Sequence, residues 1–181
     1  MTRPRRANRR GNTALSSALN WLHLSPVGGV TPVEVAMKTV RELLQGKSGA
    51  IFSIAPDARV YDALKMMAEK EIGALVVMDQ GTLAGIMSER DYARKVMLLG
   101  KSSQEIAVRD IMTGKVVTIR PSQSAEECMA LMTDHRIRHL PVMEGDRLIG
   151  VLSIGDLVKA VIEDQQVEID QLHGYIAGSA R

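Results

Sequence analysis

The sequence predicts an α+β fold made of two tandem β-α-β-β-α repeats that pack as one pseudo-symmetric module. Residues 73–92 (GALVVMDQGTLAGIMSERDY) match residues 138–157 (RHLPVMEGDRLIGVLSIGDL) at a constant shift of 65 positions, and an internal repeat decides the architecture before any local pattern does. Strand-like and helix-like apolar spacings follow the same order in both copies. One copy of about 55 residues buries too little surface to be stable alone, so we expect two interlocked copies.

The first copy is placed at residues 38–101. Its helices are expected from apolar residues on one face and its strands from short apolar runs between turn signals. The expected elements are a short helix (39–44), a strand (51–54), a helix capped by Asp57 and ending near residue 69, two strands (74–78 and 82–87) around an Asp-Gln-Gly turn, and a helix from Ser88 to about Gly100.

The second copy, residues 102–165, repeats this order. The expected elements are a helical stretch (108–112), a strand (116–119), a helix (122–134), two strands (140–143 and 147–152) around a Glu-Gly-Asp turn, and a last helix from Ser153.

Residues 166–181 are interpreted as a C-terminal helical extension. From Asp156 onward, through the end of the last helix and this extension, apolar positions recur at steps of seven and fourteen: Val158, Ile162, Ile169, Leu172 and Ile176. One helix cannot bury such a seam by itself. Two interpretations are open: the seam packs against a second subunit, or it folds back onto its own module, with a local helix end at Gly174.

The composition is that of an ordinary globular protein, with 45% hydrophobic and 24% charged residues. Aromatic residues make up only 3%, so the core must be aliphatic and methionine-rich. No apolar run is long enough to span a membrane. The single cysteine, Cys128, is expected to be a buried thiol rather than a redox group, and reducing conditions predict a cytoplasmic location.

The N-terminal segment, residues 1–36, differs from the rest of the chain. Residues 1–33 contain five arginines and no acidic residue, whereas the remainder contains 18 basic and 21 acidic residues and carries a net charge of −3. Three interpretations are open: a basic disordered segment that precedes a functional start at Met37, a transit-type peptide, or an arm that binds nucleic acid or another anionic surface. Nucleic acid is not expected as a partner, because the segment lacks the interleaved aromatic residues of a single-strand binder.

The repeated signature has a direct physical interpretation. Ser88 and Asp91, like Ser153 and Asp156, lie three residues apart where a strand ends and a helix begins, which is the spacing of a capping box. The same geometry can serve a ligand. The helix N-terminus and the hydroxyl attract phosphate, and the carboxylate can accept hydrogen bonds from a ribose diol. Capping alone is the structural alternative.

The two copies differ in their basic residues. Arg90 aligns with Gly155 and can make a bidentate phosphate contact that glycine cannot. Arg136, Arg138 and His139 form a basic cluster in the second copy only, for which a solvated strand edge is the alternative. A metal site at His135 and His139 is not expected, because these residues span a helix end and a strand start.

These features resemble a pair of cystathionine-β-synthase (CBS) domains. The resemblance covers residues 38–165. The motifs that carry it are Gly85-Ile-Met-Ser-Glu-Arg-Asp91, Gly150-Val-Leu-Ser-Ile-Gly-Asp156, Val108-Arg-Asp-Ile-Met-Thr113 and Arg138-His-Leu-Pro-Val142. The chain most resembles small stand-alone CBS proteins that have no attached enzyme or transporter domain.

The resemblance implies a ligand and an assembly. CBS pairs bind AMP, ADP, ATP, S-adenosylmethionine or nicotinamide dinucleotides in clefts between the repeats, and two pairs commonly form a disc-like dimer. A homodimer and a regulated protein target are therefore expected, with an adenine nucleotide (AMP, ATP or NAD(H)) as ligand and no catalytic cofactor.

The resemblance also implies the site residues. By this resemblance, the signature Ser and Asp contact the ribose and the phosphate. The segment that leads into each first strand contacts the adenine, and the basic residues before Leu-Pro-Val contact the phosphate. The first site is expected at Ser88, Arg90, Asp91, Met112, Thr113, Gly114, Val116 and Val117, the second at Ser153, Asp156, Lys47, Gly49, Ile51 and Phe52, and the phosphate contacts at Arg138 and His139.

The segment that leads into the first strand, called the lead-in, begins at Val40 in the first copy and at Val108 in the second, and it is three residues longer in the first copy. The second site is therefore the weaker prediction. The sequence shows no catalytic constellation, P-loop or metal-ligand spacing. The sequence therefore predicts a non-enzymatic regulatory module that binds adenosine-type nucleotides and signals by a conformational change. The alternatives are an interaction scaffold with empty clefts, and nucleic-acid binding through the N-terminus.

Overall fold

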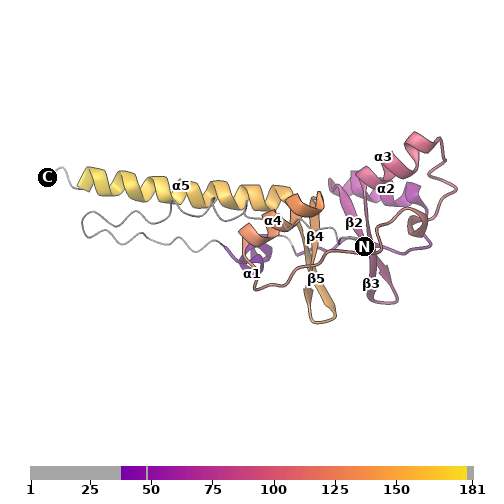
Figure 1. Cartoon of the computed structure of the whole chain (residues 1–181), viewed down its shortest axis with the longest axis horizontal. Helices are drawn as coiled ribbons and strands as arrows, with labels where there is room; N and C mark the ends of the chain where they lie inside the picture. Colours follow the sequence, from indigo (N-terminus) through magenta and orange to yellow (C-terminus); the bar gives the residue numbers. More distant parts are fainter. Residues whose placement is uncertain (1–37, 48, 179–181) are drawn as a thin grey trace, which may run out of the picture. The chain divides into compact units, whose positions relative to one another are not determined.

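The computed structural model describes residues 38–47 and 49–178. The N-terminal segment, for which three interpretations were open, lies outside the described residues. Along the chain the elements are α1 (Val40–Gln45), β1 (Ser53–Ile54), α2 (Val60–Lys70), β2 (Ala74–Asp79), β3 (Thr82–Ser88), α3 (Glu89–Lys95), the 3₁₀ helices η1 (Met97–Leu99) and η2 (Val108–Asp110), α4 (Ala125–His135), β4 (His139–Glu144), β5 (Arg147–Ser153) and α5 (Ile154–Gly178) (Figure 1).

The two hairpins confirm the repeat in atomic register. β2 pairs with β3 so that Ala74 faces Ser88, and β4 pairs with β5 so that His139 faces Ser153. Both ladders change register immediately after a valine, which is Val77 in the first hairpin and Val142 in the second. The irregularity therefore belongs to the repeated unit, and each signature serine lies at the equivalent position of its hairpin.

The first strand of each repeat differs between the copies. β1 lies parallel to β2, with Ser53 opposite Val76. The strand expected at residues 116–119 is reduced to a single parallel bridge between Ile119 and Val142. Pro141 explains the difference, because it occupies the position of Val76 and has no N–H to extend the ladder.

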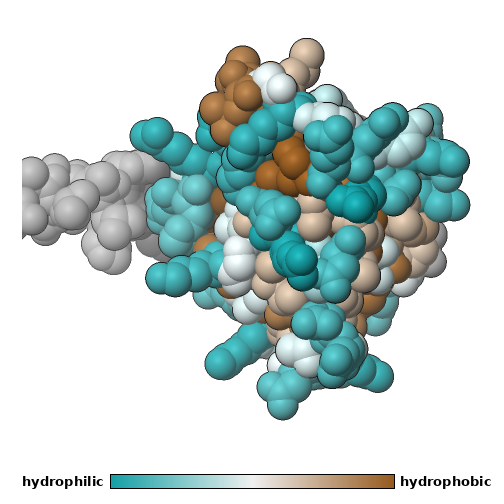
Figure 2. Space-filling view, turned by 90° about the vertical axis from the view of Figure 1, so that its right-hand side faces the viewer, coloured by the Kyte–Doolittle hydropathy of each residue, from teal (hydrophilic) through white to brown (hydrophobic). Residues whose placement is uncertain are grey.

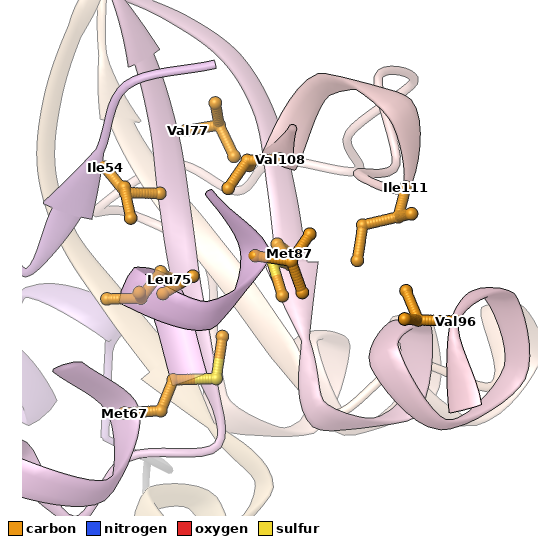
Figure 3. Close-up of a cluster of buried hydrophobic side chains, with 10 residues drawn as sticks. Ile54, Met67, Leu75, Val77, Met87, Val96, Val108 and Ile111 are labelled. Carbon is orange, nitrogen blue, oxygen red and sulfur yellow. The ribbon is translucent and has the colours of Figure 1, made fainter. Parts of the chain in front are cut away.

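Two aliphatic cores form, and each recruits a segment from the other repeat. The first core includes Val77 and Met87 from the hairpin together with Val108 and Ile111 from the segment that precedes the second repeat (Figure 3). The second core includes Val142 and, from the segment that precedes the first repeat, Val40. The lead-in segments are thus exchanged between the repeats.

Equivalent main-chain hydrogen bonds in the two repeats show this exchange. The N–H of Val40 donates to the carbonyl of Gln123, and the N–H of Val108 donates to the carbonyl of Ala58, both at 2.9 Å. The lead-in residues are related by a shift of 68 and the acceptors by the shift of 65. Because neither repeat completes its core alone, the pair is expected to fold as one unit.

The start of α2 is a correction to the prediction. Asp57 does not cap this helix. It forms an ion pair with Arg109, and the N-cap is Arg59, which makes no side-chain capping bond. The N–H of Val60 donates instead to the carbonyl of Ile106. The exchanged lead-in therefore supplies an acceptor that a local cap would have provided.

Other boundaries also move. α4 begins after Ser124 rather than at Ser122, and its capping box with Glu127 explains the position. The helix after Ser88 ends at Lys95, and a separate 3₁₀ turn carries the chain to Gly100. α5 continues through Gly174 without a break, so the local helix end considered there is wrong.

Candidate functional site

The first signature lies where β3 passes into α3. Asp91 Oδ2 accepts the Ser88 N–H at 3.0 Å and the Ser88 hydroxyl at 2.6 Å, and the Asp91 N–H donates to Ser88 Oγ at 3.3 Å. This is a complete capping box. Lys95, one turn along the helix, forms an ion pair with Asp91 Oδ1 at 2.8 Å. The carboxylate is thus held in one orientation before any ligand arrives.

The second signature reproduces this capping geometry. Asp156 Oδ2 accepts the N–H and the hydroxyl of Ser153, each at 2.7 Å. A further donor is present here: Lys47 Nζ lies 2.7 Å from the same Oδ2. Burial of Asp156 acts to raise its pKa, but the hydrogen bonds from Lys47 and from Ser153 outweigh burial and hold the pKa below its usual range.

A cavity of about 430 Å³ opens beside the first signature, between residues of the two repeats. Its size is in the range of small-molecule sites. The residues that line it are Ile86, Ser88, Arg90, Asp91, Arg94, Thr113, Lys115, Val116, Val117, His135, Arg136, Ile137, Arg138 and His139.

Most of the residues expected at the first site line this cavity. The exceptions are Met112, which packs against Gly85, and Gly114, which lines a separate pocket near the hairpin turns. The two residues expected to contact phosphate, Arg138 and His139, line the same cavity as Ser88. Their roles toward a ligand stay predictions.

Sequence reasoning did not place Arg94, Lys115 or Ile137 at this site. Arg94 follows Arg90 by one helical turn, a spacing that puts both on one face of α3, and this signal was available. Lys115 lies between the expected contacts Gly114 and Val116. The position of Ile137 could not be deduced, because it depends on where the end of α4 meets the first repeat.

The cavity is strongly basic. Its lining holds five side chains that are cationic at neutral pH, Arg90, Arg94, Lys115, Arg136 and Arg138, and one carboxylate, Asp91. Positive charges brought together in a cleft raise the local concentration of anions. The cavity therefore favours a ligand that carries several negative charges.

Besides His135, the second repeat contributes the imidazole of His139 to the lining of the cavity. Its half-burial lowers the pKa of the imidazole below 6.5, and the positive charges of Arg138 and Lys47 lower it further, against a smaller opposing effect from Asp156. A neutral imidazole can gain a proton when an anion arrives.

The residues expected at the second site are only partly brought together. Lys47 reaches Asp156 and the carbonyl of Val151, but Ile51 and Phe52 lie in a separate shallow pocket against α2. Phe52 packs on the first core, and Lys70 Nζ lies 5.6 Å from the centre of its ring. Gly49 has a φ of +69°, and no atom would lie within 4 Å of a Cβ added there. The second signature therefore has no apolar wall from Ile51 or Phe52.

Each signature glycine allows a close approach by an exchanged lead-in. A Cβ on Gly85 would lie 2.7 Å from Met112 Sδ, and a Cβ on Gly150 would lie 2.5 Å from Leu44 Cδ2. These two lead-in residues are related by the shift of 68. The contacts show that the pseudo-symmetry extends from the hairpins to the segments that cover them.

Other chemistry finds little support in the described part of the chain. Cys128 is buried, and desolvation raises the pKa of its thiol to about 11, which keeps it protonated and unreactive at neutral pH. Within residues 38–47 and 49–178, His, Cys, Asp and Glu nowhere gather in threes in a way that could hold a metal ion. None of the described helices combines the length and apolarity needed to cross a membrane.

The chain belongs to the CBS domain family. Two segments, residues 40–98 and 108–163, match this family, and they coincide with the two repeats seen in the structure. The α+β tandem module and the CBS resemblance that the sequence predicted are therefore confirmed.

Known relatives share this organisation. The CBS domain-containing protein CBSX3, mitochondrial, of Arabidopsis thaliana is 45% identical over 141 residues, covering 74% of this chain and 68% of its own. A solved structure of a protein with CBS domains from Burkholderia ambifaria is 56% identical, with a TM-score of 0.69, covering 71% of this chain and 96% of that one.

A more distant structure shares the fold and holds ligands. The CBS domain pair of protein MJ0100 was solved in complex with 5′-methylthioadenosine and S-adenosyl-L-methionine. It is 22% identical, with a TM-score of 0.60, covering 68% of this chain and 94% of that one.

Proposed function

We propose that this protein is a non-enzymatic regulatory module that binds an adenosine nucleotide bearing phosphate groups in the cavity between its two CBS motifs. The observation that carries the proposal is the pairing of one preorganised carboxylate, Asp91, with five cationic side chains around a cavity of about 430 Å³. The carboxylate suits a ribose diol, and the cations suit phosphate.

The charge of the cavity selects among adenosine ligands. MJ0100 binds methylthioadenosine, which is neutral, and S-adenosylmethionine, which carries a sulfonium cation. Neither ligand would balance the positive charge of the arginines and the lysine in this cavity, and the sulfonium cation would be repelled. AMP, ADP, ATP and NAD(H) carry the required negative charge, so they are the proposed class.

Signalling follows from where the ligand contacts lie. Ser88, Arg90 and Asp91 come from the first repeat, whereas Arg136, Arg138 and His139 come from the second. A phosphate ligand that touches both sets changes the balance between arrangements of the two repeats, provided that it binds one arrangement better. A regulated protein target and a homodimer complete the proposal, and a cytoplasmic location stays a prediction.

The test is a comparison of ligands on the purified chain. Isothermal titration calorimetry and thermal unfolding are measured with AMP, ATP, NADH, adenosine and S-adenosylmethionine. A ligand that binds only the native state stabilises it by about 2.7 kcal/mol at a hundredfold excess over its Kd. We expect this stabilisation from the phosphate ligands only.

Two results would contradict the proposal. Adenosine that binds as tightly as AMP would show that the basic residues take no part. A folded chain that binds none of these ligands would support the alternative of an interaction scaffold with empty clefts.

A further inference from the structure

The second signature is occupied by a side chain of the protein itself. Lys47 Nζ lies 2.7 Å from Asp156 Oδ2 and donates a second hydrogen bond, of 3.0 Å, to the carbonyl oxygen of Val151. Both acceptors belong to the second repeat, whereas Lys47 belongs to the exchanged lead-in of the first. One ammonium group thus connects the strand and the helix of the signature.

The same lysine position behaves differently at the first signature. Leu44 and Met112 occupy equivalent places against the signature glycines, and three residues further on the lead-ins reach Lys47 and Lys115. Lys115 lines the open cavity and has no ion-pair partner among the described residues. Lys47 is therefore paired with the signature carboxylate of the second repeat, Asp156, whereas Lys115 is not paired with that of the first, Asp91.

The strand carbonyls show why the two lysines differ. Ile86 and Val151 are equivalent residues of the two hairpins. The Ile86 carbonyl accepts the Thr113 N–H at 2.8 Å, as part of a backbone bridge between lead-in and strand. The Val151 carbonyl accepts the Lys47 ammonium instead. A main-chain carbonyl is normally paired with a donor, and at the second signature the lysine provides it, in a hydrogen bond at the protein surface.

The helices show a second cause. Asp91 has a cation on its own helix, Lys95, which binds Oδ1 and leaves Oδ2 to the capping box. The equivalent of Lys95 in α5 is Ala160, which is buried. Asp156 therefore takes its cation from Lys47, and that cation sits on Oδ2, the same oxygen that receives both Ser153 donors.

We propose that Lys47 is a built-in occupant of the second signature, so that the chain binds one nucleotide rather than two, and that Lys47 sets this number. The inference rests on the proposed function for the ligand class. A ribose hydroxyl that approaches Asp156 Oδ2 would have to displace an ammonium that belongs to the same chain and is therefore present at high effective concentration. The exchange would also leave the Val151 carbonyl without its donor.

The experiment counts nucleotides bound to the full chain by native mass spectrometry and by calorimetry, with ATP and AMP as ligands. We expect one per chain for the unaltered protein and two for Lys47→Met, which keeps the length of the side chain and removes its charge. Lys47→Arg keeps a cation and is expected to bind one. Lys65→Met removes an exposed lysine of α2 that pairs with Glu69 rather than with a signature carboxylate, and this variant is also expected to bind one.

The added ligand of the Lys47→Met variant must lie at the second signature. Adding Asp156→Asn to Lys47→Met should return the count to one. Circular dichroism and the thermal midpoint establish that each variant is folded, and Lys47→Ala serves as a second opening variant. Two nucleotides on the unaltered chain, or one on both folded opening variants, would overturn the inference.

The outcome separates this inference from the proposed function. An unaltered chain that binds none, with a Lys47→Met variant that binds one, would refute the first cavity as the nucleotide site and support the lysine as the occupant of the second. Binding to neither protein would overturn both.

Discussion

Arg90 Nη1 donates a hydrogen bond of 2.9 Å to the main-chain carbonyl oxygen of Arg136. The donor is on α3 of the first repeat, and the acceptor is the left-handed residue that ends α4 in the second. Arg90 therefore bridges the repeats at the edge of the basic cavity. Its alignment partner, Gly155, cannot make this contact, so the bridge occurs on one side of the module only.

Replacing Asp91 by Ala should weaken binding of AMP or ATP by roughly 2–4 kcal/mol, because two ribose hydroxyls lose a charged acceptor. The fold should persist, since Ser88 can still cap α3, although loss of the reciprocal bond costs about 1 kcal/mol of stability. Calorimetry measures the affinity. Asp156→Ala is the matched control, because it removes the same capping interaction at the signature that Lys47 occupies. Equal losses of affinity in both variants would contradict the assignment.

His139 should make nucleotide binding depend on pH. Burial and the neighbouring cations lower the pKa of the imidazole from 6.5, so the unfolded chain binds more protons than the folded one in the window below 6.5. Stability from this group is therefore present above pH 6.5 and is lost as pH falls. A bound phosphate reverses the effect, because it favours the imidazolium.

We accordingly expect tighter ATP binding, with proton uptake, from about pH 8 to about pH 6. Calorimetry in buffers of different ionisation enthalpy measures the uptake. His139→Gln should abolish the uptake linked to this residue, and adenosine should show none. Proton uptake that is unchanged in His139→Gln would rule out this histidine.

Gly85→Ala should destabilise the protein by about 1–3 kcal/mol. The new Cβ would lie 2.7 Å from Met112 Sδ and 3.1 Å from the Thr113 carbonyl oxygen, and that carbonyl is fixed by its hydrogen bond to the Ile86 N–H. Urea unfolding measures the change. Gly114→Ala, whose Cβ would meet its nearest neighbour at 3.9 Å, should be close to neutral. A Gly85→Ala variant as stable as Gly114→Ala would contradict the tight packing.

Truncation after Glu163 should convert a dimer into a monomer, or weaken the dimer strongly. Figure 1 shows that the distal part of α5 extends beyond the other labelled elements, and Val158, Ile162, Val167 and Ile169 are exposed along the helix. Light scattering at low micromolar concentration measures the mass. A truncated protein that is still fully dimeric would exclude the α5 seam as the interface.

Another apolar surface would then be the better candidate. Met97, Leu98 and Leu99 are exposed in the 3₁₀ turn after α3. Figure 2, which views the molecule from the side of the first repeat, shows a mainly hydrophilic face interrupted by hydrophobic patches. Substitution of Leu98 by Ser in the truncated chain would test this surface.

Part of the fold followed from the sequence because it is encoded locally. The hairpins and the capping boxes depend on residues within a few positions of one another, so the 65-residue repeat was enough to place Ser88, Asp91, Ser153 and Asp156 at equivalent strand ends. The cation cluster around Arg138 was visible for the same reason. The loss of the strand at residues 116–119 depends on Pro141 in a neighbouring strand, a pairing that local patterns do not contain.

The family resemblance already implied which lead-in meets which signature, but only the tertiary structure decided which residues of each lead-in make the contact. The lead-ins cross between the repeats, so Asp57 pairs with Arg109 rather than capping α2, and Ile51 and Phe52 face α2 rather than the second signature. The same crossing brings Lys47 onto Asp156. The contacts of Asp57 with Arg109 and of Lys47 with Asp156 join residues more than fifty positions apart. They are selected by the burial of two half-cores that neither repeat completes alone. The sequence by itself determined two equivalent serine–aspartate pairs with different basic neighbours, and long-range packing decided which cation is held on each carboxylate.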